Sequence, residues 1–480
     1  MSVLDPLTFP LDGTRIIEAS AGTGKTYTIS SLYLRLLLGD AAPVEDLTAD
    51  RILVVTFTDA ATQELRERIR ERVLDLRRAV LTGEYADDFT EGLLAKVADK
   101  PDTLECLQLA LQQMDEAAIC TIHAFCYRML REHAFESGSL FDYDYRIDDV
   151  SYRRRATTDF WRRLVYPMTG EELALVTSLW PTPEALWRVI APYLMKPDLE
   201  LRGAVDEPLS SQAGHLGHAV ERVKWCWRSD KVRSSIENSG MRKAKDRPGG
   251  PAMLARMDEW VRGEHLLRIP GESGGLENFD ELLAHYSTDR LFARSNLTQR
   301  GGPPDCEHFC GLVDVALASF RRFHATILDA AIREVSEAAI AAKLDDRLLA
   351  PDDLLMRMDA ALGGPRGRTL AASARRRFPI AMVDEFQDTD PLQYRIFQRI
   401  YEGAKDCGHY MIGDPKQAIY GFRGADIFTY IDAREAIVER DRFKLVTNHR
   451  ASPALVDAIN GFFQSNPDPF LFEEISFDAA

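Results

Sequence analysis

Residues 14–40 read TRIIEASAGTGKTYTISSLYLRLLLGD, and the eight residues ASAGTGKT at 19–26 decide the fold. Residues 14–18 fit a short buried strand, and the apolar residues after the loop recur at helical spacing. Gly22 and Gly24 let the backbone curl, so that successive N–H groups point inward at phosphate oxygens. A strand, a glycine-rich loop and a helix in this order predict a phosphate-binding P-loop.

Each residue type in this loop suits a bound nucleotide. The N-terminus of the following helix adds a partial positive charge. Lys25 is placed to reach the β- and γ-phosphates, and the Thr26 hydroxyl to ligate magnesium. The predicted cofactors are therefore ATP and Mg²⁺; the alternative is a glycine-rich turn before a helix, with no ligand. The predicted nucleotide-binding residues are Ala19, Ser20, Ala21, Gly22, Thr23, Gly24, Lys25 and Thr26.

A second acidic strand completes the pattern. Residues 377–390 read RFPIAMVDEFQDTD, a short apolar run that ends in two adjacent carboxylates. Asp384 at the end of the strand can hold magnesium, mostly through water. Glu385 can polarise the attacking water as a general base. The alternative is that both carboxylates cap the next helix.

The composition bounds the class of protein. The chain has 480 residues, a net charge of −16 and no apolar run long enough to cross a membrane. The acidic balance argues mildly against nucleic acid, but residues 221–247 hold nine Lys/Arg against four Asp/Glu, which fits a basic groove or a solvated face. Seven cysteines and no signal peptide predict reduced thiols in the cytoplasm. Cys306, His308 and Cys310 have no matching second pair, and we interpret them as scattered thiols.

Six motifs occur in one order along nearly the whole chain. Together they resemble superfamily 1A DNA helicases of the UvrD/Rep type, and among these the RecB-like subunits of RecBCD-type exonucleases. The motifs are EASAGTGKTYTI (18–29), ILVVTFTDAATQELRERIR (52–70), TIHAFCYRML (121–130), VDEFQDTDPLQYRIF (383–397), GDPKQAIYGFRGAD (413–426) and LVTNHRASPALV (445–456).

The resemblance implies an α/β fold of RecA-like P-loop type, a parallel sheet flanked by helices. Residues 1–150 and 325–445 are expected to form the ATP-binding domain 1A. Residues 150–325 are expected to form an inserted, mostly helical domain 1B. Residues 445–480 are expected to start a second RecA-like domain, 2A. Later motifs, the 2B insert and the nuclease of RecB are missing, which predicts a fragment or a shortened gene.

The resemblance also assigns roles to single residues. Gln417 is expected to sense the γ-phosphate, and Arg450 to stabilise charge on the transferring phosphoryl group. The expected contacts to single-stranded DNA include aromatic rings on which bases stack. For His123 and Phe125 a purely structural role is the alternative, and for the segment at 413–426 a strand–helix corner with its aromatics in the core. The expected DNA-binding residues are Phe57, Thr58, His123, Phe125, Tyr420, Phe422 and Arg423.

The function implied is the ATP-binding motor portion of a RecB-like helicase or translocase. It would couple Mg-ATP hydrolysis to movement on single-stranded DNA during repair of double-strand breaks by recombination. The implied partners are single-stranded and duplex-end DNA and RecC-like and RecD-like subunits, with no membrane. One alternative is an ATP-controlled single-stranded DNA-binding module that does not translocate. Another is a P-loop kinase or switch ATPase that uses no nucleic acid.

Overall fold

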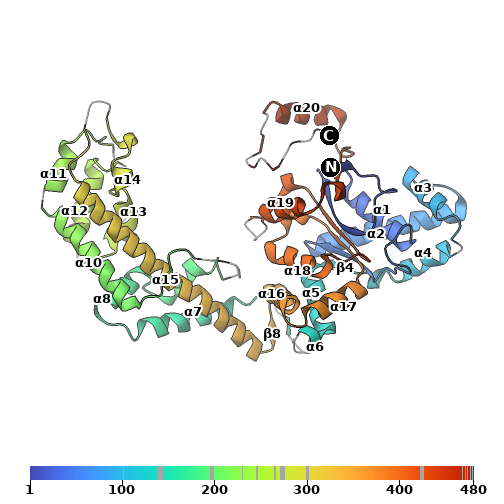
Figure 1. Cartoon of the computed structure of the whole chain (residues 1–480), viewed down its shortest axis with the longest axis horizontal. Coiled ribbons are helices and arrows are strands. Elements are labelled where there is room, and N and C mark those ends of the chain that lie inside the picture. The colour runs from blue at the N-terminus through green and yellow to red at the C-terminus, as the bar shows by residue number, and fades with distance from the viewer. Residues whose placement is uncertain are drawn as a thin grey trace. The chain divides into compact units, whose positions relative to one another are not determined.

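The computed structural model describes residues 1–100, 102–137, 144–145, 148–194, 199, 201–229, 231–244, 247–263, 266–270, 276–298, 302–421, 426–466, 469–470, 472, 474–475, 477 and 479. The chain forms two compact units (Figure 1). Unit 1 combines residues 1–145 with 349–480, and unit 2 contains residues 146–348.

A parallel sheet organises unit 1. Every neighbouring pair of its seven strands runs parallel, so all the strands end at the same edge of the sheet. This carboxyl edge is where such sheets bind ligands. In spatial order the strands are β1 (Ser2–Val3), β11 (Arg442–Leu445), β2 (Gly13–Ala19), β10 (Gly408–Gly413), β9 (Ile380–Val383), β3 (Ile52–Thr56) and β4 (Ile119–Thr121).

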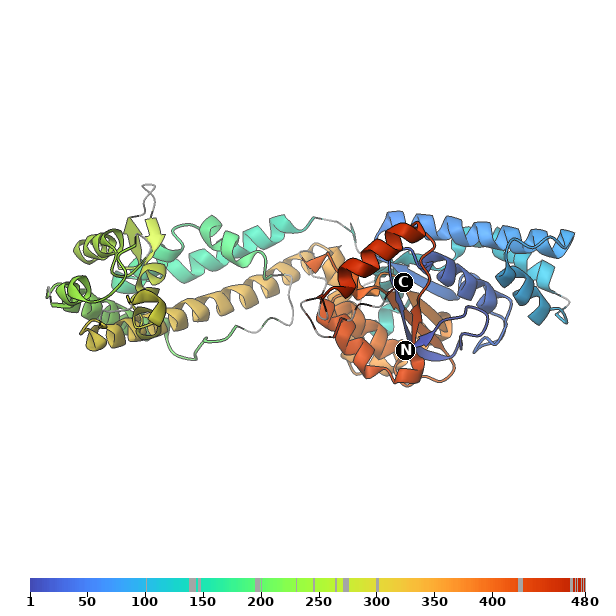
Figure 2. The ribbon, with the colours of Figure 1, turned by 90° about the horizontal axis from the view of Figure 1, so that it is seen from above.

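Helices cover both faces of this sheet (Figures 1 and 2). Successive residues of a strand point to opposite faces, so Ile17 joins one core and Ile16 the other. The first face packs α1 (Lys25–Leu37), α2 (Asp59–Thr82), α3 (Asp88–Lys96) and α4 (Thr103–Gln112). The second packs α5 (Ile122–Glu132), α16 (Pro351–Gly363), α17 (Gly367–Arg377), α18 (Pro391–Tyr401) and α19 (Ile427–Ala436). The predicted α/β class, with helices flanking a parallel sheet, is confirmed.

Shorter elements complete unit 1. They are α6 (Ala134–Ser137), the strand β5 (Asp144–Tyr145), the 3-10 turns η1 (Met114–Glu116), η3 (Phe386–Asp388), η4 (Pro415–Gln417) and η6 (Glu439–Asp441), and the helix α20 (Pro453–Gln464). None of the residues of α20 is buried, and Leu455, Ile459 and Phe462 are exposed.

Unit 2 is mostly helical and has a core of its own. Its two longest helices, α10 (Leu209–Trp227) and α15 (Glu307–Asp345), pack together. The expected domain boundary at residue 325 lies inside α15, which continues unbroken because residues 312–345 contain no glycine or proline. The other elements are α7 (Val150–Val165), α8 (Gly170–Leu179), α9 (Pro183–Ile190), α11 (Lys231–Asn238), α12 (Pro251–Arg262), β6 (Arg268–Pro270), β7 (Leu276–Asn278), α13 (Phe279–Ala284), α14 (Thr288–Leu291) and η2 (Arg294–Asn296). The short strand β8 (Leu348–Leu349) falls at the boundary, with one residue in each unit.

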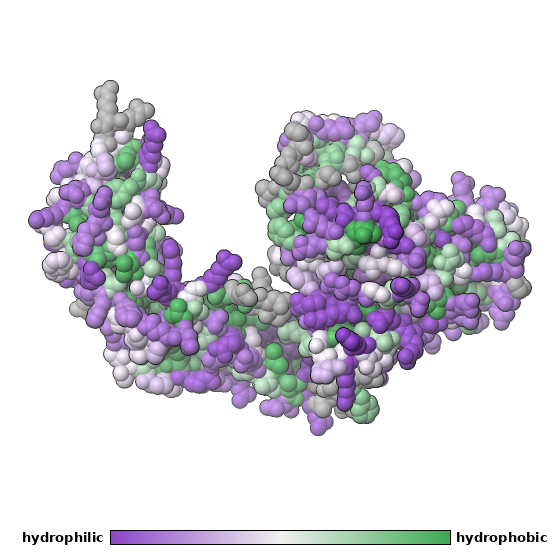
Figure 3. Space-filling model, viewed as in Figure 1, coloured by the Kyte–Doolittle hydropathy of each residue, from purple (hydrophilic) through white to green (hydrophobic). Residues whose placement is uncertain are grey.

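The molecular surface mixes residue types. The face shown in Figure 3 carries hydrophilic residues interspersed with smaller apolar areas. Among the helices of the described residues, none is both long and apolar enough to cross a bilayer. All seven cysteines are free.

Candidate active site

The glycine-rich loop connects the end of β2 to the start of α1. Gly22 and Gly24 have φ angles of +78° and +90°, a left-handed conformation that favours glycine. A Cβ atom at Gly22 would also lie 2.8 Å from Arg450 Cβ. The Thr23 hydroxyl closes the loop by donating to the carbonyl of Ser20 at 2.7 Å. Conformation and space therefore both require glycine at position 22.

The segment after β11 packs against this loop. The side-chain amide of Asn448 donates to the Ala21 carbonyl at 3.0 Å, and the His449 N–H donates to the Gly22 carbonyl at 2.8 Å. Asn448 Oδ1 in turn accepts the Arg450 N–H at 2.9 Å. The structure thus brings Arg450 next to the loop, and Asn448 is the residue that holds it there.

The two predicted carboxylates follow β9, at the same edge of the sheet. The Asp384 N–H donates to the Val55 carbonyl, and Asp384 Oδ1 accepts the N–H of Glu385, both at 2.9 Å. Glu385 has a φ of +51°, a conformation that non-glycine residues seldom adopt outside functional sites. Its carboxylate forms an ion pair with the ammonium of Lys25. The P-loop lysine and the predicted general base are therefore direct partners.

Negative charge accumulates beside Lys25. Burial, and then the charge of Glu385, raise the pKa of Asp384 to about 6. The same two causes raise the pKa of Asp388 to about 6. In each case Lys25 acts in the opposite direction. Crowded carboxylates of this kind are stabilised by a cation.

A magnesium ion fits this arrangement only with help from other ligands. Among the described residues, no three His, Cys, Asp or Glu side chains are grouped so that they alone could hold a metal. Asp384 and the exposed hydroxyl residue Thr26 offer hard oxygen atoms, which magnesium prefers. Magnesium commonly completes its coordination with water and phosphate oxygens. The residues present therefore suit a magnesium ion that arrives with a nucleotide.

The segment after β10 begins with an N-cap. Asp414 Oδ1 accepts the N–H of Lys416 at 3.1 Å, and Asp414 Oδ2 accepts the side-chain amide of Gln417 at 2.7 Å. Pro415 is the first residue of η4, as the Asp-Pro pair predicts. Gln417, the expected γ-phosphate sensor, is thus held at the carboxyl edge by the cap.

One side chain that sequence reasoning missed joins this segment to the general base. The amide of Gln387 donates to Glu385 Oε2 at 2.8 Å, and its carbonyl oxygen accepts the N–H of Asp414 at 2.9 Å. Gln387 lies in η3 and is only 2% exposed. A glutamine two residues after the paired acids was the available signal, but its partner is distant in sequence.

Two of the expected DNA contacts meet at the edge of the sheet. The rings of Phe57, after β3, and Tyr420, after η4, stack with centroids 5.6 Å apart and an interplanar angle of 27°. Both side chains are half-buried. Thr58 is exposed and caps α2 by accepting the N–H of Ala61 at 3.1 Å. These residues form a partly open aromatic surface beside the loops.

The remaining expected DNA contacts separate. His123 is half-buried, and burial lowers its pKa. Phe125 is only 1% exposed and lies among the rings of Phe378 and Phe397, at 5.9 and 5.6 Å, so its surroundings fit the structural alternative, a core residue. Its apolar spacing within α5 was the overlooked signal. Phe422 and Arg423 lie outside the described residues.

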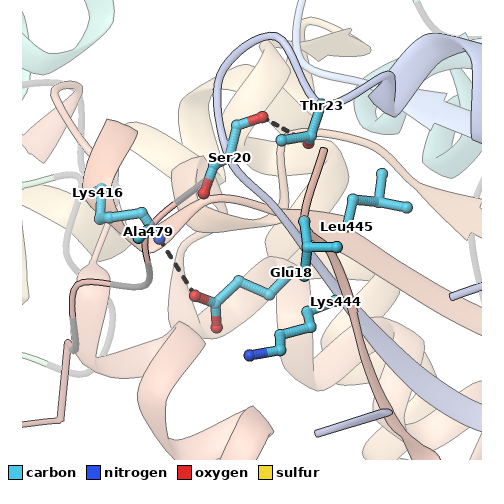
Figure 4. A pocket seen from close by; sticks show the side chains of 8 residues that line it. Glu18, Ser20, Thr23, Lys416, Lys444, Leu445 and Ala479 are labelled. Atoms are coloured by element: carbon cyan, nitrogen blue, oxygen red, sulfur yellow. Dashed lines mark hydrogen bonds and ion pairs between the residues drawn. The ribbon is translucent and has the colours of Figure 1, made fainter. Parts of the chain in front are cut away.

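A small hollow of about 20 Å³ borders the P-loop on its β11 side (Figure 4). Within it the ammonium of Lys416 pairs with Glu18 at 3.2 Å and with Asp414 at 3.1 Å. Burial alone would lower the pKa of Lys416, but these two carboxylates outweigh it and raise the pKa. The lining residues are Glu18, Ser20, Thr23, Lys416, Lys444, Leu445, Val446 and Ala479.

Comparison with known proteins places this geometry in a family context. Residues 4–199 and 295–437 match the family described as UvrD/REP helicase N-terminal domain. The chain is similar to RecBCD enzyme subunit RecB of Escherichia coli (strain K12), with 41% identity over 99% of this chain and 40% of that protein. It is also similar to RecB of Haemophilus influenzae, with 34% identity over 99% of this chain and 42% of that protein. The chain thus spans about 40% of the length of these relatives.

Proposed function

The chain belongs to the UvrD/REP helicase family, and we propose that it is the ATP-binding motor portion of a RecB-like DNA helicase. The observation that carries the proposal is the ion pair of Lys25 with Glu385, at the same sheet edge as the stacked rings of Phe57 and Tyr420. A nucleotide site and an aromatic DNA surface thereby share one edge. A P-loop kinase would have no use for the second.

Nucleotide chemistry begins with an exchange of partners. Phosphate oxygens in the loop 19–26 compete with Glu385 for the ammonium of Lys25, since both are anions. Once Lys25 turns to phosphate, the Glu385 carboxylate can accept a proton from the attacking water. Thr26 and Asp384 would hold magnesium, which neutralises charge on the phosphates. Before a nucleotide binds, Glu385 is therefore paired with Lys25 and cannot yet act as the base.

Gln417 and Arg450 complete the proposed nucleotide site. Gln417 would sense the γ-phosphate, and its anchor on Asp414 supports a defined starting position. Arg450 would stabilise the transferring phosphoryl group, and its proximity to Gly22 supports that role. Unit 1 up to residue 445 would be domain 1A, unit 2 domain 1B, and residues after 445 the start of domain 2A.

The proposed DNA track includes Phe57, Thr58 and Tyr420. His123 belongs to it through its place in the motif at 121–130. Stacking on such rings tolerates any base, which suits a motor. Phe422 and Arg423 are added to the proposed track through the family resemblance.

The proposed substrates are single-stranded DNA and duplex ends in double-strand-break repair. RecC-like and RecD-like subunits are the proposed partners, because the relatives are named as subunits of a RecBCD enzyme. The seven free cysteines favour the cytoplasm.

A second candidate function is an ATP-controlled single-stranded DNA-binding module that does not translocate. The lack of any buried residue in α20 favours it, because α20 follows Arg450 closely and adds no buried core to hold this arginine in place. Phosphoryl transfer depends on such positioning. The two candidates differ in whether DNA accelerates ATP hydrolysis.

The test is the steady-state ATPase rate with and without single-stranded DNA. It should compare the 480-residue chain with a chimera in which the corresponding remainder of E. coli RecB continues the chain. Motor function predicts slow turnover by the chain alone and DNA-stimulated turnover by the chimera. An Arg450→Ala substitution should then matter in the chimera far more than in the chain. Turnover that ignores DNA in both proteins would reject the motor.

A further inference from the structure

A continuous set of hydrogen bonds joins the P-loop lysine to the segment after β10. Lys25 pairs with Glu385, and Glu385 Oε2 accepts the amide of Gln387 at 2.8 Å. Gln387 Oε1 accepts the Asp414 N–H at 2.9 Å, and Asp414 Oδ2 accepts the amide of Gln417 at 2.7 Å. Gln387 is the member that crosses from one loop to the other.

The surroundings of Gln387 fix it in one position. A Cβ atom at Gly413 would lie 2.6 Å from Gln387 Oε1 and 3.1 Å from the Gln387 backbone nitrogen. Only glycine at 413 therefore lets β10 approach so closely. A buried amide bonded at both ends resists movement, because a shift leaves a polar group without a partner.

The chemistry of the site requires an amide at this position. One end must donate to the Glu385 carboxylate and the other must accept a backbone N–H. The glutamine amide does both in a neutral state with separate donor and acceptor atoms, and the asparagine side chain is one methylene shorter. The charged groups around the amide are Lys25, Glu385, Asp388 and Asp414. A further negative charge at position 387 would face carboxylates at close range.

We infer that Gln387 is a positioning residue that couples the nucleotide site to the DNA-facing rings. This inference rests on the proposed function. When Lys25 binds phosphate, Glu385 loses its ion pair but still accepts the hydrogen bond from Gln387. A shift of the Glu385 carboxylate would therefore also displace Gln387. That displacement reaches the Asp414 N-cap and, through η4, Tyr420 and its partner Phe57. Nucleotide occupancy would in this way change the grip of the ring pair.

Coupling of this kind must be reciprocal. If a bound nucleotide changes DNA affinity by some factor, bound DNA changes nucleotide affinity by the same factor. Couplings between sites are commonly about 5- to 150-fold, and we expect about tenfold here. The ratio of the DNA affinities measured with and without nucleotide isolates this coupling from any general weakening of either site.

The experiment measures an oligothymidine's affinity for the 480-residue chain, with and without magnesium and a non-hydrolysable ATP analogue. Gln387→Met removes both hydrogen bonds at nearly constant volume. Gln387→Glu keeps an acceptor for the Asp414 N–H but sets a carboxylate against Glu385. The matched control is Gln393→Met, since Gln393 is a buried glutamine in α18, 8% exposed and outside this set of bonds. Thermal melting reports on folding.

The expected result is a coupling of about tenfold in the wild type and in Gln393→Met, and about onefold in both Gln387 variants. Gln387→Glu should keep the nucleotide-free DNA affinity of the wild type, because the N-cap retains its acceptor. The inference is overturned if Gln387→Met keeps the wild-type ratio, or lowers stability and both affinities while the ratio persists. A wild-type chain that binds DNA without coupling also overturns it. A wild-type chain that binds no DNA instead overturns the proposed function.

Discussion

The two units bury charge in opposite ways. In unit 2 the single carboxylate of Asp149 pairs with Lys343 at 2.6 Å and with Arg153 at 2.8 Å. At the carboxyl edge of unit 1, Lys25 faces three carboxylates, those of Asp384, Glu385 and Asp388. Asp388 Oδ1 is buried and has no hydrogen-bond partner among the described residues.

This difference in charge distinguishes a structural ion-pair cluster in unit 2 from the proposed nucleotide site in unit 1. In the Asp149 cluster two cations neutralise the one carboxylate in place, and the cluster links α7 to α15. The edge of the sheet keeps an excess of carboxylates and a left-handed Glu385, both of which cost stability. Such a cost persists where a ligand later compensates it. The imbalance, more than the burial of charge, marks the functional edge.

The strongest test of this contrast is Glu385→Gln. The amide cannot accept a proton, so hydrolysis should fall by about 10²- to 10⁴-fold, while nucleotide affinity stays near that of the wild type. Single-turnover hydrolysis and equilibrium binding measure the two effects. Asp149→Asn in unit 2 is the control, and it should lower the melting temperature without changing the hydrolysis rate per folded molecule. If both variants lost hydrolysis equally, the proposed difference between the Asp149 cluster and the Glu385 site would be disproved.

The second test pairs two lysines, Lys25 and Lys343. Lys25→Ala should weaken nucleotide binding by about 1.5–3 kcal/mol, or roughly 10- to 100-fold, because the phosphates lose a charge-assisted donor. Lys343→Met should lower the free energy of unfolding and leave nucleotide affinity unchanged. Isothermal titration with an ATP analogue and denaturant unfolding separate these outcomes. Nucleotide affinity that survives Lys25→Ala would disprove the P-loop assignment.

The third test pairs Phe57, which follows β3, with Phe125 in α5, the helix after the neighbouring strand β4. Phe57→Ala should weaken binding of single-stranded DNA by about 1–3 kcal/mol with little sequence preference. Phe125→Ala should instead cost about 3–5 kcal/mol of folding stability, because it empties a core position. Fluorescence anisotropy and thermal melting give both numbers. If Phe125→Ala stays fully stable and loses DNA affinity, the core assignment fails.

The smallest expected effect concerns pH. Burial lowers the pKa of His409 to about 4, where it lies against Phe397 and Tyr401. The unfolded chain protonates near pH 6.5, so stability is full above that pH and is lost as pH falls toward 4. At pH 5 the loss is about 2 kcal/mol. His409→Phe should therefore reduce the fall in melting temperature between pH 7 and pH 5, and the exposed His215→Gln should not.

Local patterns made much of the fold predictable. The strand, loop and helix at 14–40 and the acidic strand at 380–385 carry their signals in adjacent residues, and the structure forms both. The parallel sheet follows from such units. The burial of Phe125 could also be predicted, because Ile122, Phe125, Cys126, Met129 and Leu130 trace the buried face of a helix.

What sequence reasoning missed depends on distant partners. Gln387 is explained only by Asp414, and Asn448 only by the loop at 20–24. Neither pairing leaves a periodicity or a spacing within its own segment. At the level of domains, the boundary expected at residue 325 falls within the unbroken helix α15.

The order of strands has a consequence for synthesis on the ribosome. The P-loop strand β2 lies between β10 and β11, which begin about 390 and about 420 residues after it in sequence. At about 5–20 residues per second, β2 waits roughly 20–80 s for β10 to be made. During that interval both its edges are unpaired and its isoleucines lack their final packing, which calls for chaperones. Unit 2 is translated in full before β10 exists, so nucleotide binding should be among the last properties that the nascent chain acquires.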